Sequence, residues 1–409
     1  MKSVVFITQG IYPLNSGSAL NSYGYCVEFS KFTQLKVLSL LPSNIDVLAA
    51  KREMKDSLNV DFYHSKSDNR VADLLFKSII NTRAKFEFVR PIYKTFYKGI
   101  VNYLLNHRTD IVIIDHIVMF EYFEKLRKKF PKICFIYNSH NVEFVNCDDE
   151  YLKNGRFSAN ISGFFKKKIT QLRCKRRKVC EKILLSKCKK SFCISVHDME
   201  LMDKEFGVKG KLIHTKPMIR FSKIKTIEDM GDYHYKLMIV ASMNWYPNVE
   251  GIIWFVENVF ARIISINPCY KLYLVGKDPH DELIRLQMRY ENNIIVTGFV
   301  ESTGDYFKMC DISIVPVFIG TGAKIKVLES IGRGIPTIVS DFAAKDYNLN
   351  DEAVIAYQAE DYINAILQIE KRVDFRREIF YKMERYCNSY YQLPYEVSAI
   401  FENQQGESA

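Results

Sequence analysis

The chain has 409 residues, more than one hydrophobic core ordinarily supports, so we expect two domains. Apolar residues make up 48% of the chain and aromatic residues 13%, which excludes an intrinsically disordered protein. The formal net charge is +11, and no run of 18 or more apolar residues occurs, so the sequence predicts no membrane-spanning helix.

Strand-like and helix-like stretches alternate through the first half of the chain. The opening MKSVVFITQG has one lysine and a short apolar run, which predicts a β-strand rather than a signal peptide. Most of the predicted strands are continuous apolar runs, as is typical of parallel strands buried on both faces. The predicted strands are 3–9, 36–41, 60–64, 110–115, 133–138 and 191–196, with amphipathic helices at 19–32 and 117–130 among the stretches between them.

The basic residues are concentrated in one segment at the end of this half. Between Lys166 and Lys190 there are twelve lysines and arginines and one acid, Glu181, which leaves 46 basic and 46 acidic residues elsewhere. Apolar residues are threaded through the segment, so it predicts either a partly packed helix with a solvated basic face or a helix that binds an anionic partner. An anionic membrane surface is the partner we expect, because no nucleic-acid-binding module accompanies the patch.

The second half begins after a polar stretch without hydrophobic period, 217–234, which predicts a linker. Strand–helix alternation then resumes, which predicts βαβ units and a parallel sheet. The predicted strands are 236–242, 271–275, 294–297, 311–317, 336–340 and 353–357, and the predicted helices are 248–265, 281–290, 302–309, 322–333 and 360–372.

The fold predicted from these elements is α/β, with two doubly wound, Rossmann-like domains. The first domain is expected at 1–216 and the second at 235–375, while the amphipathic stretch 376–402 is expected to form helices, with 376–409 packing back on the first domain. Because ligands of such sheets bind at the carboxyl ends of the strands, we expect the site in a cleft between the two domains.

Metal and disulfide chemistry leave no signature in the sequence. The ten cysteines include no Cys-x-x-Cys pair, so we expect reduced thiols and a cytoplasmic protein. The chain contains no Asp-x-Asp and no His-x-x-x-His, so we expect no bound metal and no cofactor besides a substrate.

The stretch that carries the chemistry is GTGAKIKVLESIGRGIPTIVS, residues 320–340. Gly320 and Gly322 lie where a strand turns into a helix, so the free amides and the helix dipole favour a phosphate there. Lys324 and Lys326 add positive charge, and Glu329 is suited to accept hydrogen bonds from a ribose diol. The alternative is an ordinary strand–turn–helix in which Lys326 and Glu329 form an ion pair.

This stretch resembles the retaining nucleotide-sugar glycosyltransferases of glycosyltransferase family 4, the group 1 family with the GT-B fold. The resemblance extends over KLYLVG, IIVTGFVES, YFKMCDISIVPV and IVASMNWYPNVEGIIWF, which together span most of the C-terminal half. The first half matches more loosely, through ITQGIYPLNSGSALNSYGY, NSHNVEF and CISVHDMELM.

The resemblance implies roles for individual residues. Glu329 would bind the donor ribose, Phe299 and Val300 would line the base pocket, and Gly17 and Ser18 would approach the donor diphosphate. His140 would lie against the transferred sugar, although a histidine at such a position is often only a packed residue. The predicted catalytic residues are His140, Lys326 and Glu329, and the predicted donor-binding residues are Gly17, Ser18, Asn244, Phe299, Val300, Gly320, Thr321, Gly322 and Lys324.

The sequence departs from the family pattern at two places. Many members carry a second glutamate eight residues before the ribose glutamate, where this chain has Thr321. Many also carry an arginine and a lysine after the first strand of the second domain, where this chain has SMNWYPNVEG. In that loop Pro247 predicts a second helix start near Asn244, and Trp245 and Tyr246 would line the sugar site or cover the domain edge.

The function expected from the resemblance is retaining, metal-independent transfer of a sugar from a nucleoside diphosphate sugar to a glycan or lipid-linked glycan in surface polysaccharide assembly. The expected location is the cytoplasm, at the inner face of the membrane. A catalytically silent partner subunit and a nucleotide-sugar epimerase remain as alternatives. A nicotinamide-dependent oxidoreductase is disfavoured, since the first strand runs into GIYPLNSGSAL without Gly-x-Gly-x-x-Gly.

Overall fold

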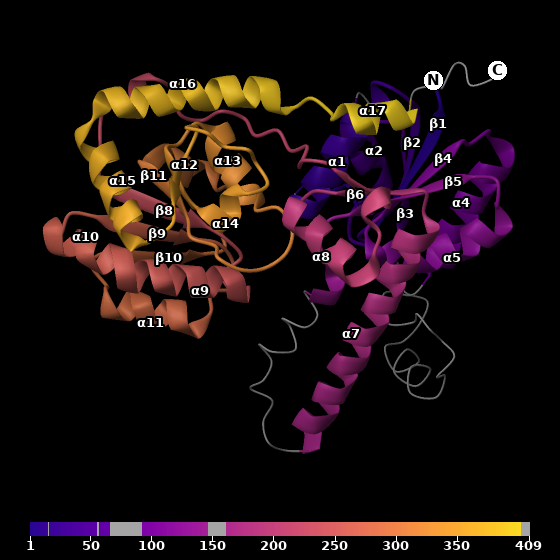
Figure 1. The fold of residues 1–409 in the computed structure, drawn as a ribbon, viewed down its shortest axis with the longest axis horizontal. Helices are drawn as coiled ribbons and strands as arrows, with labels where there is room; N and C mark the ends of the chain where they lie inside the picture. The colour runs from indigo at the N-terminus through magenta and orange to yellow at the C-terminus, as the bar shows by residue number, and fades with distance from the viewer. Residues whose placement is uncertain (15, 55–56, 66–91, 146–160, 402–409) are drawn as a thin grey trace. The chain divides into compact units, whose positions relative to one another are not determined.

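The computed structural model describes residues 1–14, 16–54, 57–65, 92–145 and 161–401, with side chains of 161–173 excepted. The chain divides into two compact units (Figure 1). Unit 1 comprises Met1–Ile219 and Leu393–Ala409, and unit 2 comprises Arg220–Gln392. The first division therefore falls inside the predicted linker, and the chain returns to unit 1 at residue 393 rather than at 376.

Unit 1 is built on a seven-stranded, wholly parallel sheet in the order β3-β2-β1-β4-β5-β6-β7. The parallel arrangement follows from the apolar runs in the sequence, because all or nearly all residues of β1, β2 and β4 are buried and these strands have no polar face. The strands are β1 (Ser3–Thr8), β2 (Gln34–Leu41), β3 (Val60–His64), β4 (Ile111–Asp115), β5 (Cys134–Ser139), β6 (Lys190–Cys193) and β7 (Leu212–His214). The prediction missed β7, which is only three residues long.

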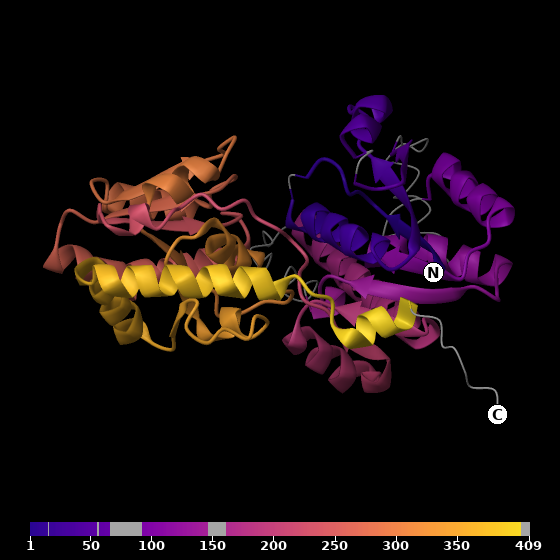
Figure 2. The same ribbon diagram turned by 90° about the horizontal axis from the view of Figure 1, so that it is seen from above.

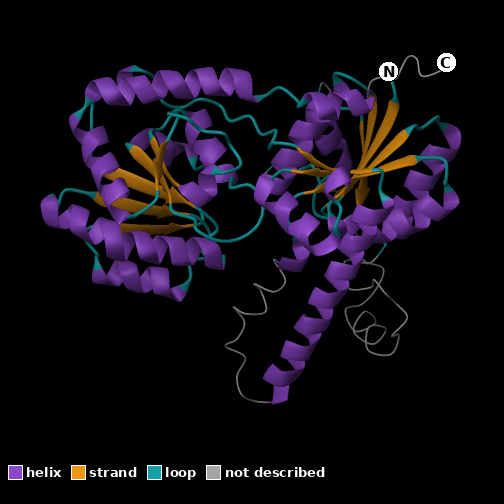
Figure 3. Ribbon diagram, viewed as in Figure 1, coloured by secondary structure: helices purple, strands orange, loops and turns teal. Residues whose placement is uncertain are grey.

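Helices cover both faces of this sheet (Figure 3). They are α1 (Gly17–Ser30), α2 (Val47–Met54), α4 (Lys94–Asn106), α5 (Phe120–Lys129), α7 (Ile161–Lys187), α8 (Val196–Phe206) and α17 (Tyr395–Phe401), with short 3-10 turns η1 (Ile117–Met119) and η2 (Lys209–Lys211). Aromatic packing holds α17 against this unit, because the ring centroids of Phe29 on α1 and Phe401 on α17 lie 5.0 Å apart.

Unit 2 repeats the same topology with a six-stranded parallel sheet, β10-β9-β8-β11-β12-β13. The strands are β8 (Lys236–Val240), β9 (Lys271–Val275), β10 (Ile294–Gly298), β11 (Ile312–Val315), β12 (Thr337–Ser340) and β13 (Val354–Ala356). The helices are α9 (Tyr246–Phe255), the π-helical η4 (Val256–Phe260), α10 (Ala261–Ile266), α11 (Asp281–Arg289), α12 (Gly304–Met309), α13 (Ile325–Arg333), α14 (Asp341–Ala344), α15 (Ala359–Lys371) and α16 (Val373–Tyr390), with the 3-10 turn η3 (Glu228–Met230).

The predicted helical stretch 376–402 is two helices that belong to different units. α16 runs along unit 2, where it contacts α13 and α15, and α17 lies on unit 1 (Figure 2). Pro394 lies between them, and a proline restrains the preceding residue from continuing a helix. Only the second of the two helices therefore packs back as expected.

Close backbone approach ties α9 to the central strands of unit 2. A Cβ added at Gly251 would lie 1.7 Å from the carbonyl oxygen of Pro316, the residue after β11. Only glycine fits where two backbones come this close. The start of α9 is therefore held directly beside the loop that leads from β11 to α13.

The hydropathy of the helices and the state of the cysteines bear on two expectations from the sequence. None of the helices in the described ranges has an apolar stretch long enough to cross a membrane. Eight cysteines with described side chains are free thiols, but Cys174 is disulfide-bonded, so the expectation of fully reduced cysteines is wrong at this residue. Spacing cannot reveal such a bond, because it depends on which cysteines the fold brings together.

Candidate functional site

The predicted donor residues in the loops after β8 and β11 lie at the point where the strand order of unit 2 reverses, whereas Phe299 and Val300 follow the edge strand β10. The sheet grows from β8 toward β9 and β10, and then from β11 toward β12 and β13, so the loops after β8 and β11 part at the carboxyl edge. This switch point is where ligands bind in doubly wound sheets. The loop after β8 carries Asn244 and Trp245, and the loop after β11 carries Gly320, Thr321 and Gly322.

The two loops touch one another. A Cβ at Gly320 would lie 3.2 Å from Cγ of Pro247 and 3.4 Å from Cη2 of Trp245. Gly320 and Gly322 have φ of 99° and 74°, a left-handed conformation that side chains with a Cβ rarely adopt. The glycines are therefore required by the turn itself, and α13 starts later than predicted, at Ile325.

Lys324 holds this turn together. Its side chain is buried, and its Nζ donates to the carbonyl oxygens of Gly322 at 2.5 Å, Thr321 at 3.2 Å and Gly320 at 3.3 Å. The ammonium group also lies 4.9 Å from the centroid of the Phe342 ring. The sequence predicted a positive charge that would attract a phosphate here, whereas the structure gives Lys324 a fixed role in shaping the glycine loop.

Lys326 reaches across to the other loop. Its Nζ donates to Oδ1 of Asn248 at 2.5 Å, and Nδ2 of Asn248 donates to the carbonyl oxygen of Ser242 at 2.9 Å. Burial and the nearby charge of Lys324 lower the pKa of Lys326 to about 7. No ion pair between Lys326 and Glu329 forms, so the alternative drawn from the sequence does not describe this helix.

Glu329 is on α13, and its side chain contacts the loop that follows β10. Its Oε1 accepts hydrogen bonds from Nε of Arg333 at 3.2 Å and from Oγ1 of Thr303 at 3.4 Å. Its Oε2 makes no hydrogen bond within the part of the chain that the structure describes. One carboxylate oxygen is therefore free to accept from a ligand hydroxyl.

The start of α13 has the character of an anion site. No side chain caps the helix N-terminus among the described residues, and its first turn contains no acid. The N–H groups of Ile325 and Val327 donate to the carbonyl oxygens of Ala323 and Lys324, so the helix dipole and the ammonium groups of Lys324 and Lys326 are what attract negative charge here. The remaining predicted residues differ in exposure: Thr321 is buried, Val300 is half-buried, and Asn244 and Phe299 are exposed.

Unit 1 places a second polar cluster at its own switch point, between β1 and β4. Asp115 ends β4 and is fully buried. Its Oδ2 accepts from Thr8 and Ser22, each at 2.7 Å, and its Oδ1 accepts from Asn138 at 2.8 Å. His140, the predicted sugar contact, lies 2.8 Å from Oδ1 through its Nε2.

His116 completes this cluster. Its ring stacks on that of His140, with centroids 3.8 Å apart and planes 16° apart, and its Nε2 lies 2.6 Å from Oγ of Ser18. Its φ of 69° is a conformation that is uncommon for residues with a side chain and that concentrates at functional sites. The predicted residue Gly17 opens α1 beside Ser18 and is half-buried.

The sequence interpretation named Ser18 and His140 but missed Asp115 and His116. The signal was present in DIVIIDH, where a carboxylate and a histidine directly follow an apolar strand. Such side chains emerge at the carboxyl edge of the sheet, where sites form.

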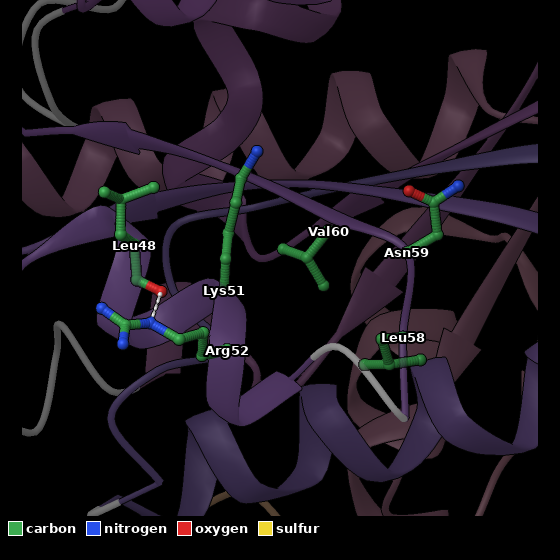
Figure 4. A pocket seen from close by; sticks show the side chains of 6 residues that line it. All are labelled: Leu48, Lys51, Arg52, Leu58, Asn59 and Val60. Carbon is green, nitrogen blue, oxygen red and sulfur yellow. Dashed lines mark hydrogen bonds between the residues drawn. The ribbon is translucent and has the colours of Figure 1, made fainter.

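No group of three or more potential metal ligands occurs among the described residues. A pocket of about 590 Å³ lies at the β3 edge of unit 1, lined by Leu48, Lys51, Arg52, Leu58, Asn59 and Val60 (Figure 4). None of the predicted site residues lines it, and Lys51 and Arg52 are engaged with Asp61 and the carbonyl oxygen of Leu48.

Comparison with known proteins identifies the family of unit 2. Residues 234–372 match the family described as glycosyl transferases group 1. A Klebsiella pneumoniae protein, described as an uncharacterized 44.6 kDa protein in the cps region, is 24% identical over 185 residues. That match covers 42% of this chain and 47% of the relative, so this chain spans about half of the curated protein that it matches.

Solved structures resemble the whole chain at low identity. HepE of Anabaena, solved with UDP and glucose, has a TM-score of 0.64 at 10% identity, with 98% of this chain and 97% of that chain covered. TarM has a TM-score of 0.64 at 11% identity, with 96% of each chain covered. Sucrose-phosphate synthase of Thermosynechococcus elongatus has a TM-score of 0.62 at 11% identity, with 98% of this chain and 97% of that chain covered. Residues 234–372 therefore belong to the group 1 glycosyl transferases, and the two parallel-sheet units have the GT-B fold of these solved structures.

Proposed function

We propose that this protein transfers a sugar, with retention of configuration, from a nucleoside diphosphate sugar to a glycan or lipid-linked glycan. The observation that carries the proposal is the start of α13, where an uncapped helix N-terminus, two lysines and the free Oε2 of Glu329 occur together. A diphosphate matches the positive end of the helix dipole and the ammonium groups, and a ribose diol matches the carboxylate oxygen. HepE, solved with UDP and glucose, supports uridine as the first base to test.

The proposed chemistry needs no metal. The bond between the anomeric carbon of the sugar and the diphosphate oxygen breaks, and the charge that develops on the diphosphate is stabilised by the helix dipole of α13 and by Lys326. The acceptor hydroxyl attacks the same face of the anomeric carbon and gives its proton to the departing phosphate oxygen. Activity should therefore persist when divalent cations are chelated.

The setting that we propose is surface polysaccharide assembly, in the cytoplasm, at the inner face of the membrane. The relative in a cps region supports the setting, and the basic segment that ends at Lys190 supports the membrane surface. The residual alternatives are a catalytically silent partner, which Thr321 in place of the second glutamate favours, and a nucleotide-sugar epimerase. Release of free sugar from the donor would exclude the first of these, and strict dependence of turnover on an acceptor would exclude the second.

The first test measures thermal stabilisation by UDP, GDP, ADP and NAD⁺. Ligand at about 100 times its Kd stabilises the folded protein by roughly 2.7 kcal/mol, which shifts the melting temperature measurably. We expect one nucleoside diphosphate to raise the melting temperature of the wild type and the shift to disappear in Glu329→Ala. Glu291→Ala is the matched control, since this glutamate is exposed on the same unit.

The result would overturn the proposal if no nucleoside diphosphate shifted the melting temperature, or if NAD⁺ alone did so. A shift that survived unchanged in Glu329→Ala would remove Glu329 from the donor site while keeping the nucleotide.

A further inference from the structure

The two oxygens of Asp115 have different partners. Oδ2 accepts from the hydroxyl groups of Thr8 and Ser22, which come from β1 and α1. Oδ1 accepts from Asn138 and faces Nε2 of His140, at the end of β5. One oxygen is therefore bound to the body of the unit, and the other is bound to the strand end that carries the predicted sugar contact.

The carboxylate determines where the proton of His140 lies. An ionised carboxylate oxygen only accepts, so the ring must carry a proton on Nε2 to make the 2.8 Å contact. Burial raises the pKa of Asp115, but the charges of His140 and His116 and the hydrogen bonds from His140 and Thr8 outweigh burial and hold it below its usual value. Asp115 is therefore ionised at neutral pH, and in the neutral ring the lone pair lies on Nδ1.

Nδ1 of His140 has no hydrogen-bond partner within the described part of the protein. Oδ1 of Asn138 likewise has no partner there, so the orientation of this amide is set by the bond from its Nδ2 to Asp115. Nδ2 of Asn138 lies 3.2 Å from Nε2 of His140, but its shorter contact is the 2.8 Å hydrogen bond that it donates to Oδ1 of Asp115. The stacking of His116 on His140 keeps the ring from tilting away from the carboxylate.

We propose that Asp115 is a positioning residue of the sugar-transfer site: it fixes His140 with its proton on Nε2, so that Nδ1 accepts a hydrogen bond from a sugar hydroxyl. This role rests on the proposed function, because the sugar is the ligand that the histidine would meet. Asp115 itself does not touch the sugar, since its side chain is fully buried. A general orienting role of this kind, a carboxylate behind an imidazole, is well suited to holding one tautomer.

The competing explanation is that Asp115 only joins strand ends. Ser22→Ala and Thr8→Val provide matched controls, because each removes one hydrogen bond to the same carboxylate on the oxygen that does not face His140. A merely structural carboxylate would respond similarly to losses on either oxygen. A positioning carboxylate would respond differently, and the difference would appear at His140.

The test is nitrogen-15 NMR of the histidine rings in the wild type, Asp115→Asn and Ser22→Ala, with His140→Gln used to assign the signal. We expect the wild-type ring of His140, when neutral, to carry its proton on Nε2. In Asp115→Asn the amide can present an N–H to Nε2, so we expect the proton to move to Nδ1 and the transfer rate to fall roughly 100-fold. Ser22→Ala should keep both the wild-type tautomer and the wild-type rate.

A neutral His140 with its proton on Nδ1 in the wild type would overturn the proposal, even if Asp115→Asn failed to fold. An Asp115→Asn protein with unchanged tautomer, or with a rate no lower than that of Ser22→Ala, would overturn it as well. Burial raises the pKa of the neighbouring Tyr25 and Cys26, so both stay neutral beside Asp115 in these experiments. Failure of the donor site is distinguishable, since nucleotide stabilisation depends on Glu329 in unit 2 and the tautomer is observed without substrate.

Discussion

At the scale of single residues, the charge of Lys326 is the most consequential property of the proposed donor site. The side chain is tied to Asn248 and has a pKa of about 7, against 10.5 for an unperturbed lysine. Between these two pH values the unfolded chain binds more protons than the folded one, so the free energy of unfolding rises with pH across this window. In the ligand-free protein, the buried charge of protonated Lys326 therefore lowers the free energy of unfolding at low pH. A bound diphosphate would offset this loss of stability.

The first residue-scale prediction concerns proton uptake. At pH 8 most of the free protein should have a neutral Lys326, while a bound diphosphate should favour the ammonium form. Binding of UDP should therefore take up ~0.9 proton per site at this pH. Calorimetric titration in two buffers of different ionisation enthalpy measures the uptake.

The control for this prediction is Lys326→Arg, because the guanidinium stays charged at every accessible pH. UDP should still bind to this variant, with proton uptake close to zero. Equal uptake in the two proteins would show that another group titrates on binding.

At the scale of elements, α7 is joined to the loop after β5 through a buried acid. The carboxylate of Glu181 accepts from the backbone N–H groups of Glu143 at 3.1 Å and Phe144 at 3.2 Å. Burial raises the pKa of Glu181 to about 8, and the charges of Glu143 and Asp198 add to this rise while the two N–H groups oppose it. The basic helix therefore supports the same loop that begins with His140.

The element-scale prediction is a pH dependence of stability. Because the pKa of Glu181 is higher in the folded chain than its usual 4.5, the folded chain binds more protons between about pH 4.5 and 8. Its stabilising contribution is present below the lower value and is lost as the pH rises through about 8, at a cost of a few kcal/mol. Glu181→Gln, which stays neutral, should flatten the fall in melting temperature between pH 5 and pH 9.

Glu200→Gln is the control, since this glutamate is exposed on α8 in the same unit. Its pH profile should match that of the wild type. An unchanged slope in Glu181→Gln would contradict the assignment of the pH dependence to the buried acid.

At the scale of the whole molecule, the charge is asymmetric along the chain. The segment Lys166–Lys190 carries the whole net excess of +11, and the described part of α7 and the residues after it expose Lys175, Lys182, Lys187 and Lys189. Each lysine near an anionic bilayer contributes about 1 kcal/mol of attraction, which decreases with added salt. The basic segment is therefore suited to reversible binding at an anionic membrane surface.

The whole-molecule prediction is tested by cosedimentation with vesicles. The wild type should bind vesicles that contain phosphatidylserine at low salt, bind less at high salt, and not bind neutral phosphatidylcholine vesicles. Serine at positions 175, 182, 187 and 189 should reduce binding at least roughly 10-fold, given ~1 kcal/mol per lysine. Serine in place of the exposed Lys94, Lys98, Lys128 and Lys129 changes the net charge equally and should leave binding close to that of the wild type.

Equal losses of binding in the two quadruple variants would mean that net charge, and not the basic segment, attracts the protein to vesicles. No binding of the wild type at low salt would remove the membrane surface as a partner.

The sheets could be predicted from the sequence because their strands are buried on both faces. Runs such as SVVFIT and IVIID contain almost no polar residue, and this pattern is specific to parallel sheets covered by helices. The short β7 could not be predicted, because three residues carry no period. The end of unit 2 was also misjudged, since amphipathic pattern shows that a helix packs but not which surface it packs on.

The residue types of the proposed donor site could be selected from the sequence, but the hydrogen bonds among them could not. The glycines, lysines and glutamate of GTGAKIKVLES were all selected, yet the sequence could not show that Lys324 binds the loop carbonyls while Lys326 reaches Asn248. Those partners are up to 78 residues apart in the chain. The spacing of residues in the sequence shows which side chains are neighbours on one helix. It contains no information about a loop that packs beside that helix in the folded protein.

The sequence by itself determined the two parallel-sheet domains, the glycine turn before α13 and the concentration of charge before Lys190, because hydrophobic period, backbone freedom and net charge are local properties. Only the tertiary structure decided that Asp115, His116, His140 and Ser18 meet. They come from the ends of β4 and β5 and from helix α1, and the parallel pairing of β4 with β5 brings those two strand ends to one edge of the sheet. Side-chain chemistry at a site depends on such contacts between distant segments, and they exist only once the chain has folded.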